Sequence, residues 1–353
     1  MEPTPSIRCL LALCFLLLAV QRTGGVQATE PERDNPYASL EVAATNPFPW
    51  AHLPEEQPPL SKQDPSSDRL LLASGLQSEA GSDNRSIDPR ESLLERSDDP
   101  WRPQVLPEGV IYHSYWAGLH EPRMGLQLVS ESGGGSFWDP TLGGRVGLFR
   151  YGNDDPLHPQ GWQLDVEGAV LARLTLDDMR DLDMVDFRGG VPLTYGIDNW
   201  QFKLGYYHLS SHLGDEYAIR IPGSLDDRIN YVRDALILGA SWYPVDYIRL
   251  YAEGAYAFNA TGGAEPWEFQ FGAEFARAGV TGPGGTPFLA FNSHLREEHN
   301  FGGDFNIESG WLWRNQSGHT LRVGAFYFNG KSSQYQFYDD SQQQTGGGVW
   351  YDF

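Results

Sequence analysis

The segment Trp267-Glu-Phe-Gln-Phe-Gly-Ala-Glu-Phe275 alternates, residue by residue, between two kinds of side chain. One parity is apolar and almost entirely aromatic, and the other carries Glu268, Gln270, Gly272 and Glu274. Successive side chains of a β-strand point to opposite faces, so the segment predicts a strand with one apolar and one polar face. Aromatic residues at both ends of such a strand are typical of a transmembrane barrel.

The same period of two recurs along the chain, for example in 162–174 and 200–206. Counting such segments predicts twelve strands, centred near residues 126, 146, 168, 190, 206, 237, 252, 271, 290, 308, 324 and 349. The fold class is therefore all-β: a transmembrane antiparallel up-and-down barrel of about twelve strands, with ten or fourteen as alternatives. Tight turns at 196–199, 244–246 and 314–318 alternate with longer connections at 213–229, 259–265 and 331–343. With an even strand count, both termini are expected at the end with the short turns.

Composition excludes several classes of protein. The chain has 353 residues and a net charge of −22, which disfavours nucleic-acid binding because phosphate contacts need clustered Lys and Arg. Such a chain length would by itself suggest two or three domains. Residues 105–353, however, hold 36 of the 40 glycines and 41 of the 46 aromatic residues, together with a net charge of −15. We therefore expect one barrel domain at 105–353.

The first 104 residues differ from the rest. Residues 1–28 are typical of a secretory signal peptide, with Arg8, the apolar run Cys9–Val20, and a small-x-small cleavage site at Val26-Gln27-Ala28. Both cysteines of the chain lie inside this segment. Residues 29–104 contain 11 prolines and no sustained period, which predicts a disordered acidic linker. The expected location is the outer membrane of a double-membraned bacterium, reached by export through the cleaved signal peptide.

The chain ends in a pattern of glycine and aromatic residues, with Gly348, Tyr351 and the terminal Phe353. This pattern resembles the C-terminal insertion signal of bacterial outer-membrane barrels, although Gly346 stands where a polar residue is usual. The resemblance implies that the barrel-assembly machinery binds these three residues.

Several segments together resemble a family catalogued as domain of unknown function 1207. They are Gly205-Tyr-Tyr-His-Leu-Ser-Ser-His-Leu-Gly-Asp215, Asn230-Tyr-Val-Arg-Asp234, Ala264-Glu-Pro-Trp-Glu-Phe-Gln-Phe271, His294-Leu-Arg-Glu-Glu298 and Asn329-Gly-Lys-Ser-Ser-Gln-Tyr335. The resemblance implies an exported membrane barrel and supplies no activity.

A candidate catalytic group lies on the outward parity. Following Trp200 in steps of two places His208 and Ser210 on the lipid side, and counting back from Trp242 does the same for Asp234. If the hairpin closes symmetrically about Ile221, Asp234 lies opposite His208, at a Cβ separation of roughly 5 Å. Ser210 could then act as nucleophile, His208 as base and Asp234 as the residue that orients the base.

This outward His-x-Ser pattern is similar to that of the outer-membrane phospholipase and lipid A deacylase families. It departs from them because their orienting residue lies closer along the chain and because Ser211 stands where asparagine is usual. The alternative interpretation is a polar rim where the strand leaves the membrane.

A third interpretation is a narrow solute channel or a structural surface barrel. The inward parity carries seven basic and seven acidic residues, which predicts ion pairs in the lumen rather than rings of one charge. The basic set is Arg145, Arg173, Arg188, Lys203, Arg233, Arg249 and Arg322; the acidic set is Asp165, Glu167, Asp186, Glu253, Glu268, Glu274 and Glu308.

No cofactor is expected, apart from a possible Ca²⁺ ion at an acidic loop. That loop carries Asp177, Asp178, Asp181, Asp183 and Asp186 without the ligand spacing of a known calcium loop. The remaining expected partner is outer-membrane lipid, and the oligomeric state is left open.

Overall fold

The computed structural model describes residues 100–176, 181–226 and 228–353. The predicted signal peptide and all but the last five residues of the predicted linker lie outside this range. No helix within it is long and apolar enough to cross a membrane.

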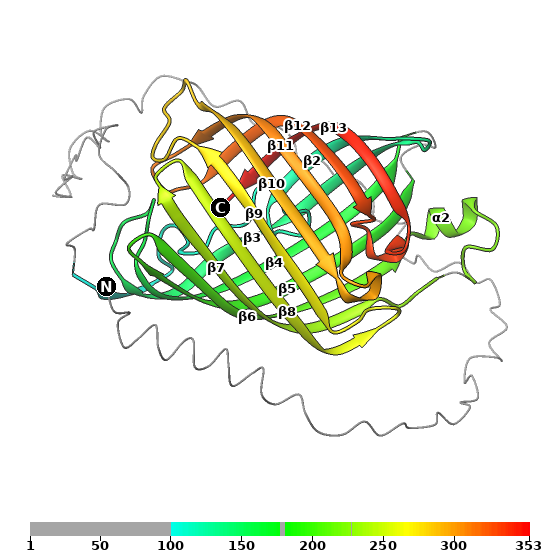
Figure 1. Cartoon of the computed structure of the whole chain (residues 1–353), viewed down its shortest axis with the longest axis horizontal. Coiled ribbons are helices and arrows are strands. Elements are labelled where there is room, and N and C mark those ends of the chain that lie inside the picture. Colours follow the sequence, from blue (N-terminus) through cyan, green and yellow to red (C-terminus); the bar gives the residue numbers. More distant parts are fainter. Residues whose placement is uncertain (1–99, 177–180, 227) are drawn as a thin grey trace, which may run out of the picture. The chain divides into compact units, whose positions relative to one another are not determined.

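Twelve antiparallel strands form a closed barrel (Figure 1). Closure is complete because β13 pairs with β2, β2 with β3, and β3 with β4. Each strand covers one predicted centre, so the predicted fold class and the count of twelve are confirmed. The strands are β2 (Met124–Glu131), β3 (Ser136–Gly152), β4 (Gly161–Thr175), β5 (Leu182–Ile197), β6 (Trp200–Leu213), β7 (Val232–Val245), β8 (Ile248–Thr261), β9 (Trp267–Ala276), β10 (Thr286–Arg296), β11 (Gly302–Arg314), β12 (Thr320–Lys331) and β13 (Ser341–Asp352).

Both ends of the described chain lie at the same end of the barrel, which we call the terminal end. Arg102 pairs with Gly152 at the end of β3, and the Phe353 ring lies 5.7 Å from that of His319, in the turn before β12. The turns at 198–199, 246–247 and 315–319 are short, as predicted. The connections at 153–160 and 277–285, on the same end, are longer than the turns expected there.

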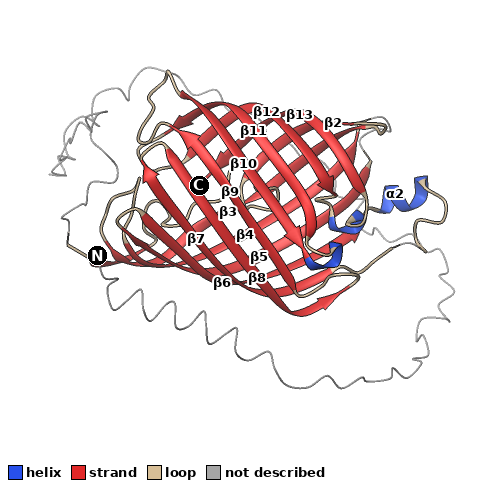
Figure 2. Cartoon of the chain, in the orientation of Figure 1, coloured by secondary structure: helices blue, strands red, loops and turns tan. Residues whose placement is uncertain are grey.

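The opposite end, which we call the loop end, carries the helical segments (Figure 2). The connection between β6 and β7 contains α2 (Asp215–Arg220), and two short 3-10 helices, η1 (Glu297–His299) and η2 (Tyr335–Phe337), follow β10 and β12.

The two faces of the wall divide as the alternation predicts. Outward positions of β9 such as Phe269, Phe271 and Phe275 are exposed, whereas Glu268 and Glu274 are buried inside. The fourteen charged residues assigned to the inward parity all have buried side chains. Buried charges are stable only when paired, and most of these form ion pairs, for example Lys203 with Glu253 at 2.5 Å and Arg322 with Glu308 at 2.5 Å.

The first strand of the wall is split by an insertion. The short strand β1 (Arg102–Val105) pairs with residues 149–152 of β3, whereas β2 pairs with residues 136–142 of the same strand. Between β1 and β2 the chain leaves the wall and runs through the lumen as residues 106–123, which we call the luminal segment (Figure 1). The sequence predicted that paired side chains occupy the lumen; the structure adds a stretch of backbone to them.

Candidate functional site

His208 and Asp234 face each other on the outward side of β6 and β7. The register pairs them directly, as the hairpin prediction requires, and His208 Nδ1 lies 2.8 Å from Asp234 Oδ1. The side chains are 46% and 19% exposed, so both reach the surface of the wall. The same symmetric closure about Ile221 would also pair Asn230 with His212, but the pairing of β6 with β7 ends at Ser210 and Val232.

Two further residues hold the Asp234 carboxylate. Tyr206 Oη donates to Asp234 Oδ1 at 2.7 Å, and Asn259 Nδ2 on β8 donates to Asp234 Oδ2 at 2.7 Å. With His208 Nδ1 also donating, three groups from the two neighbouring strands β6 and β8 fix the carboxylate. Sequence reasoning missed Asn259, because alternation along β8 places it on the inward face. A bulge in the β7–β8 pairing, between Asp234 and Ala235, brings Asn259 opposite Asp234.

Ser210 lies two residues beyond His208 on the same face, which separates their backbones by about 6.6 Å. Within the described residues, Ser210 and His208 share no hydrogen bond. Phe187 of β5 pairs with Ser210, and its ring contacts that of His212 at 5.7 Å. The structure therefore brings His208 and Asp234 into contact and places Ser210 beside them.

The height of this group on the wall can be estimated along β6. Trp200 and Trp242 stack at the terminal end, with ring centroids 5.7 Å apart. His208 is eight residues further, about 26 Å along a strand that tilts by about 40° in barrels of this kind, or roughly 20 Å in height. Because the apolar band of such barrels is about 25 Å tall, His208 and Ser210 lie near its far edge.

A second polar system anchors the luminal segment. The segment forms neither helix nor strand, and its backbone carbonyls are bonded by side chains of the wall. Arg249 Nη2 donates to His113 O at 2.8 Å, Asn306 Nδ2 to Ala117 O at 2.9 Å, and Arg145 Nη1 to Tyr112 O. Wall arginines thus replace the hydrogen bonds that a strand would have supplied.

Carboxylates of the wall complete this anchoring. Glu274 Oε1 accepts from the Trp116 backbone N–H at 2.7 Å, while its Oε2 pairs with Arg249 at 3.3 Å. Tyr115 Oη donates to Glu253 at 3.0 Å, and the Tyr115 ring stacks on that of Tyr251 at 3.9 Å. One sequence signal could have identified the segment: Tyr112, Tyr115 and Trp116 are aromatic but do not alternate.

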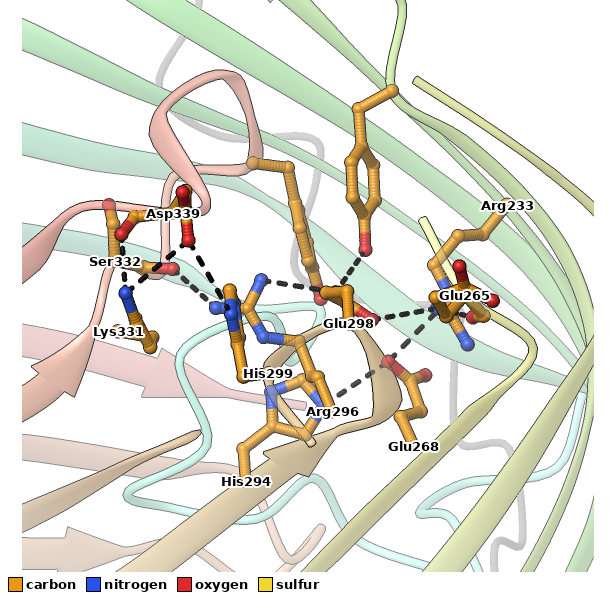
Figure 3. Close-up of polar contacts among 12 residues, drawn as sticks. Arg233, Glu265, Glu268, His294, Arg296, Glu298, His299, Lys331, Ser332 and Asp339 are labelled. Atoms are coloured by element: carbon orange, nitrogen blue, oxygen red, sulfur yellow. Dashed lines mark hydrogen bonds and ion pairs between the residues drawn. The ribbon is translucent and has the colours of Figure 1, made fainter. Parts of the chain in front are cut away.

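A third polar cluster ties the loops of the loop end together (Figure 3). Arg233 of β7 donates to Glu265 O at 2.6 Å, and Arg296 of β10 donates to Ser332 O at 2.9 Å. His120 Nε2, from the luminal segment, donates to Ser333 O at 2.7 Å, which joins the segment to this cluster. Burial and the neighbouring Arg296 lower the pKa of His299, so its ring is neutral at neutral pH.

The acidic residues proposed as a calcium site do not all lie together. Asp181 and Asp183 both pair with Arg220 of α2, and Asp186 points inward, where its Oδ2 lies 3.4 Å from the Tyr335 backbone N–H. Asp177 and Asp178 lie outside the described residues. The Ca²⁺ ion stays a prediction.

The C-terminal residues pack at the terminal end. Tyr351 Oη lies 2.9 Å from His319 Nδ1, and the Tyr351 and Phe353 rings meet edge to face at 5.1 Å. The Phe353 ring also covers Gly144, where an added Cβ would lie only 2.9 Å from it. Gly348 lies in β13 opposite Gly324 of β12.

Comparison with known proteins identifies the family to which the chain belongs. No curated protein matches the chain. Among solved structures, the chain is similar to outer membrane phospholipase A from Escherichia coli, with 12% identity, a TM-score of 0.42, and coverage of 74% of this chain and 96% of the other. It is also similar to the calcium-bound dimer of the Salmonella typhi outer membrane phospholipase, with 12% identity, a TM-score of 0.43, and coverage of 66% and 92%. The model of the family described as "Protein of unknown function (DUF1207)" matches residues 131–353, so the chain, an outer-membrane-type β-barrel, belongs to that family, as its sequence segments indicated.

Proposed function

We propose that the protein is an acyl hydrolase that cleaves ester-linked lipids of the outer membrane from the outside of the barrel. Ser210 is the nucleophile, His208 the general base and Asp234 the residue that orients His208. The observation that carries the proposal is the 2.8 Å contact between His208 Nδ1 and Asp234 Oδ1, on an outward face with Ser210 beside it. That contact leaves His208 Nε2 as the nitrogen that can accept a proton from serine.

The reaction divides into two balanced steps. Ser210 Oγ attacks the ester carbonyl carbon while its proton passes to His208 Nε2, and the departing alkoxide takes that proton as the carbon–oxygen bond breaks. A water molecule then attacks the acyl-serine, giving a proton to His208, and the serine oxygen recovers a proton as the fatty acid leaves. Asp234 stays ionised and stabilises the imidazolium in both steps.

The position on the wall favours lipid as the substrate. A charged or polar group on the lipid face is costly at the bilayer midplane and much less so near an interface. His208 and Ser210 lie near the edge of the apolar band, at the depth where the ester groups of lipids meet the hydrocarbon region. An aqueous substrate would not need a site on the outward face.

The assay that tests this proposal uses the full chain refolded into vesicles that contain phospholipid or lipid A. We expect fatty acid release by the unmodified protein, and a rate at least about 10⁴-fold lower in Ser210→Ala. His212→Ala is the matched control, because His212 shares the outward face but has no contact with Asp234; it should lose less than about tenfold. Release of fatty acid that survives Ser210→Ala would exclude this serine as nucleophile, and an inactive unmodified protein would exclude the function.

The route to the membrane forms part of the same proposal. We infer that residues 1–28 direct export and are cleaved, and that the assembly machinery binds Gly348, Tyr351 and Phe353. The ordered packing of Phe353 against Gly144 and His319 is compatible with a terminal residue that is recognised first and buried at closure.

Truncation of Phe353 should therefore lower the yield of folded barrel in outer membranes by about tenfold while leaving detergent refolding nearly unchanged. Heat-modifiable migration on gels measures both. Equal losses in cells and in detergent would mean that Phe353 acts only through packing.

A further inference from the structure

The luminal segment closes the barrel. Ile111, Tyr112, Tyr115 and Ala117 have no exposed surface, so no water-wide passage runs alongside these side chains. A barrel of eight strands has an interior that side chains fill, and one of sixteen leaves an aqueous channel. Twelve strands lie between these limits, and here the extra width is occupied by the segment.

The wall side chains that surround the segment are of the kind that line a water-filled lumen. The seven basic and seven acidic side chains that alternation places inside are joined there by further charged groups of both signs, such as Arg150, Arg296, Asp304 and Asp352. An apolar lumen would be closed permanently by packing, whereas these groups would be hydrated if the segment moved away. Balanced charge also favours passage of small hydrophilic solutes without strong selection for one sign.

The backbone leaves the sheet at the entry of the segment. Its last bond to β3 runs from the Leu106 N–H to Leu148 O at 3.1 Å, and Arg150 then bonds the carbonyls of Glu108 and Gly109. Leu106, which follows β1, has a positive φ of 50°, and Pro107 cannot donate to a neighbouring strand. Beneath the segment, at the terminal end, lies a cavity of about 80 Å³ lined by residues that include His113, Ser114 and Arg314. This cavity provides space next to the middle of the segment.

Hydrogen bonds to the wall hold the segment without making it part of the sheet. Arg249 and Glu274 bind its backbone from one side, and Asn306 binds it from another. Once the segment has moved, water can replace each of these bonds, because the wall partners are charged or polar side chains that face the lumen. No strand pairing has to break for residues 107–122 to leave their place.

We infer that the barrel is a closed channel for small hydrophilic solutes and that residues 106–123 are its gate, which opens by withdrawing towards the terminal end. This inference does not depend on the hydrolase proposal, since that site lies on the outer face of the wall.

The first experiment measures conductance in planar bilayers. Residues 107–123 are replaced by a Gly-Ser linker of about eight residues, long enough to span the roughly 20 Å between the partners of Leu106 and Met124 on β3. We expect the unmodified barrel to be closed for most of the time, and the variant to show long discrete openings in potassium chloride. A folded variant that conducts no better than the unmodified protein would overturn the assignment.

The second experiment does not require the deletion variant to fold. Ala117→Cys, in a chain whose Cys9 and Cys14 are replaced by serine, is treated in vesicles with a small cationic thiol reagent. A moving gate predicts labelling at least about tenfold faster than unfolding of the barrel. Ala235→Cys on β7 is the matched control that should stay protected, because Ala235 is equally buried but packs with Tyr231 and Tyr335 rather than against the segment. Labelling of Ala117→Cys no faster than unfolding would show that the segment is a fixed filler.

Discussion

Asp234→Asn is expected to reduce lipid ester hydrolysis by about 10⁴-fold while the barrel stays folded. The reason is the tautomer of His208. An asparagine amide has one oxygen and one NH2 group, and Tyr206 and Asn259 already donate to the two carboxylate oxygens. The amide therefore either loses one of those bonds or presents its NH2 group to His208, which favours the tautomer with the proton on Nε2. That tautomer cannot accept a proton from Ser210.

The measurement is the initial rate of fatty acid release from vesicles, with folding checked by heat-modifiable migration. Asn259→Ala is the matched control, because it removes one donor to Asp234 Oδ2 and leaves the His208 contact intact. It should lose no more than about tenfold. If Asp234→Asn keeps the rate within about threefold, Asp234 is a rim residue rather than part of a catalytic group.

Arg249→Leu is expected to lower the free energy of unfolding by about 3–5 kcal/mol, the usual result of breaking a buried ion pair from one side. The guanidinium pairs with Glu274 at 3.3 Å, bonds Ser241 Oγ at 3.1 Å, and bonds the carbonyls of His113 and Ser114 at 2.8 and 3.3 Å. Leucine leaves a buried carboxylate without its cation and two backbone carbonyls without a donor. Urea unfolding in vesicles, followed by tryptophan fluorescence, measures the change.

Two control variants show how much of the loss in unfolding free energy arises because the Arg249–Glu274 pair is buried, rather than from removal of an arginine charge alone. Arg102→Leu removes the exposed pair with Asp154 and should cost less than about 1 kcal/mol. The double variant Arg249→Leu with Glu274→Leu should recover part of the loss, since it removes the uncompensated charge. A single variant as stable as the unmodified protein would show that water reaches Glu274 and that the segment is not anchored there.

The wall could be predicted from sequence because its signal is local. Alternation of apolar and polar side chains identifies each strand, as in Trp267–Phe275. A short turn between two strands then determines which of their residues pair. Symmetric closure about Ile221 was enough to place Asp234 opposite His208, and the structure has that pair. Ser210 was placed on the correct face by the same rule.

The luminal segment could not be predicted in this way. Its conformation depends on partners distant in sequence, such as Asn306, which bonds Ala117 O from 189 residues away. No period of its own reveals such contacts. The inward arginines were identified, but their bonds to backbone carbonyls follow only once the segment is known to lie among them.

The split first strand also constrains the order in which the chain can assemble. β2 has eight residues against seventeen in β3, and the seam that joins the last strand to the first is formed by β2 and β13. The luminal segment is tethered to β1 at one end and to β2 at the other, so pairing of β2 with β13 encloses the space that the segment occupies. We therefore expect pairing of β2 with β13 to be a late event of biogenesis, after which the segment can enter or leave the lumen only through the terminal end.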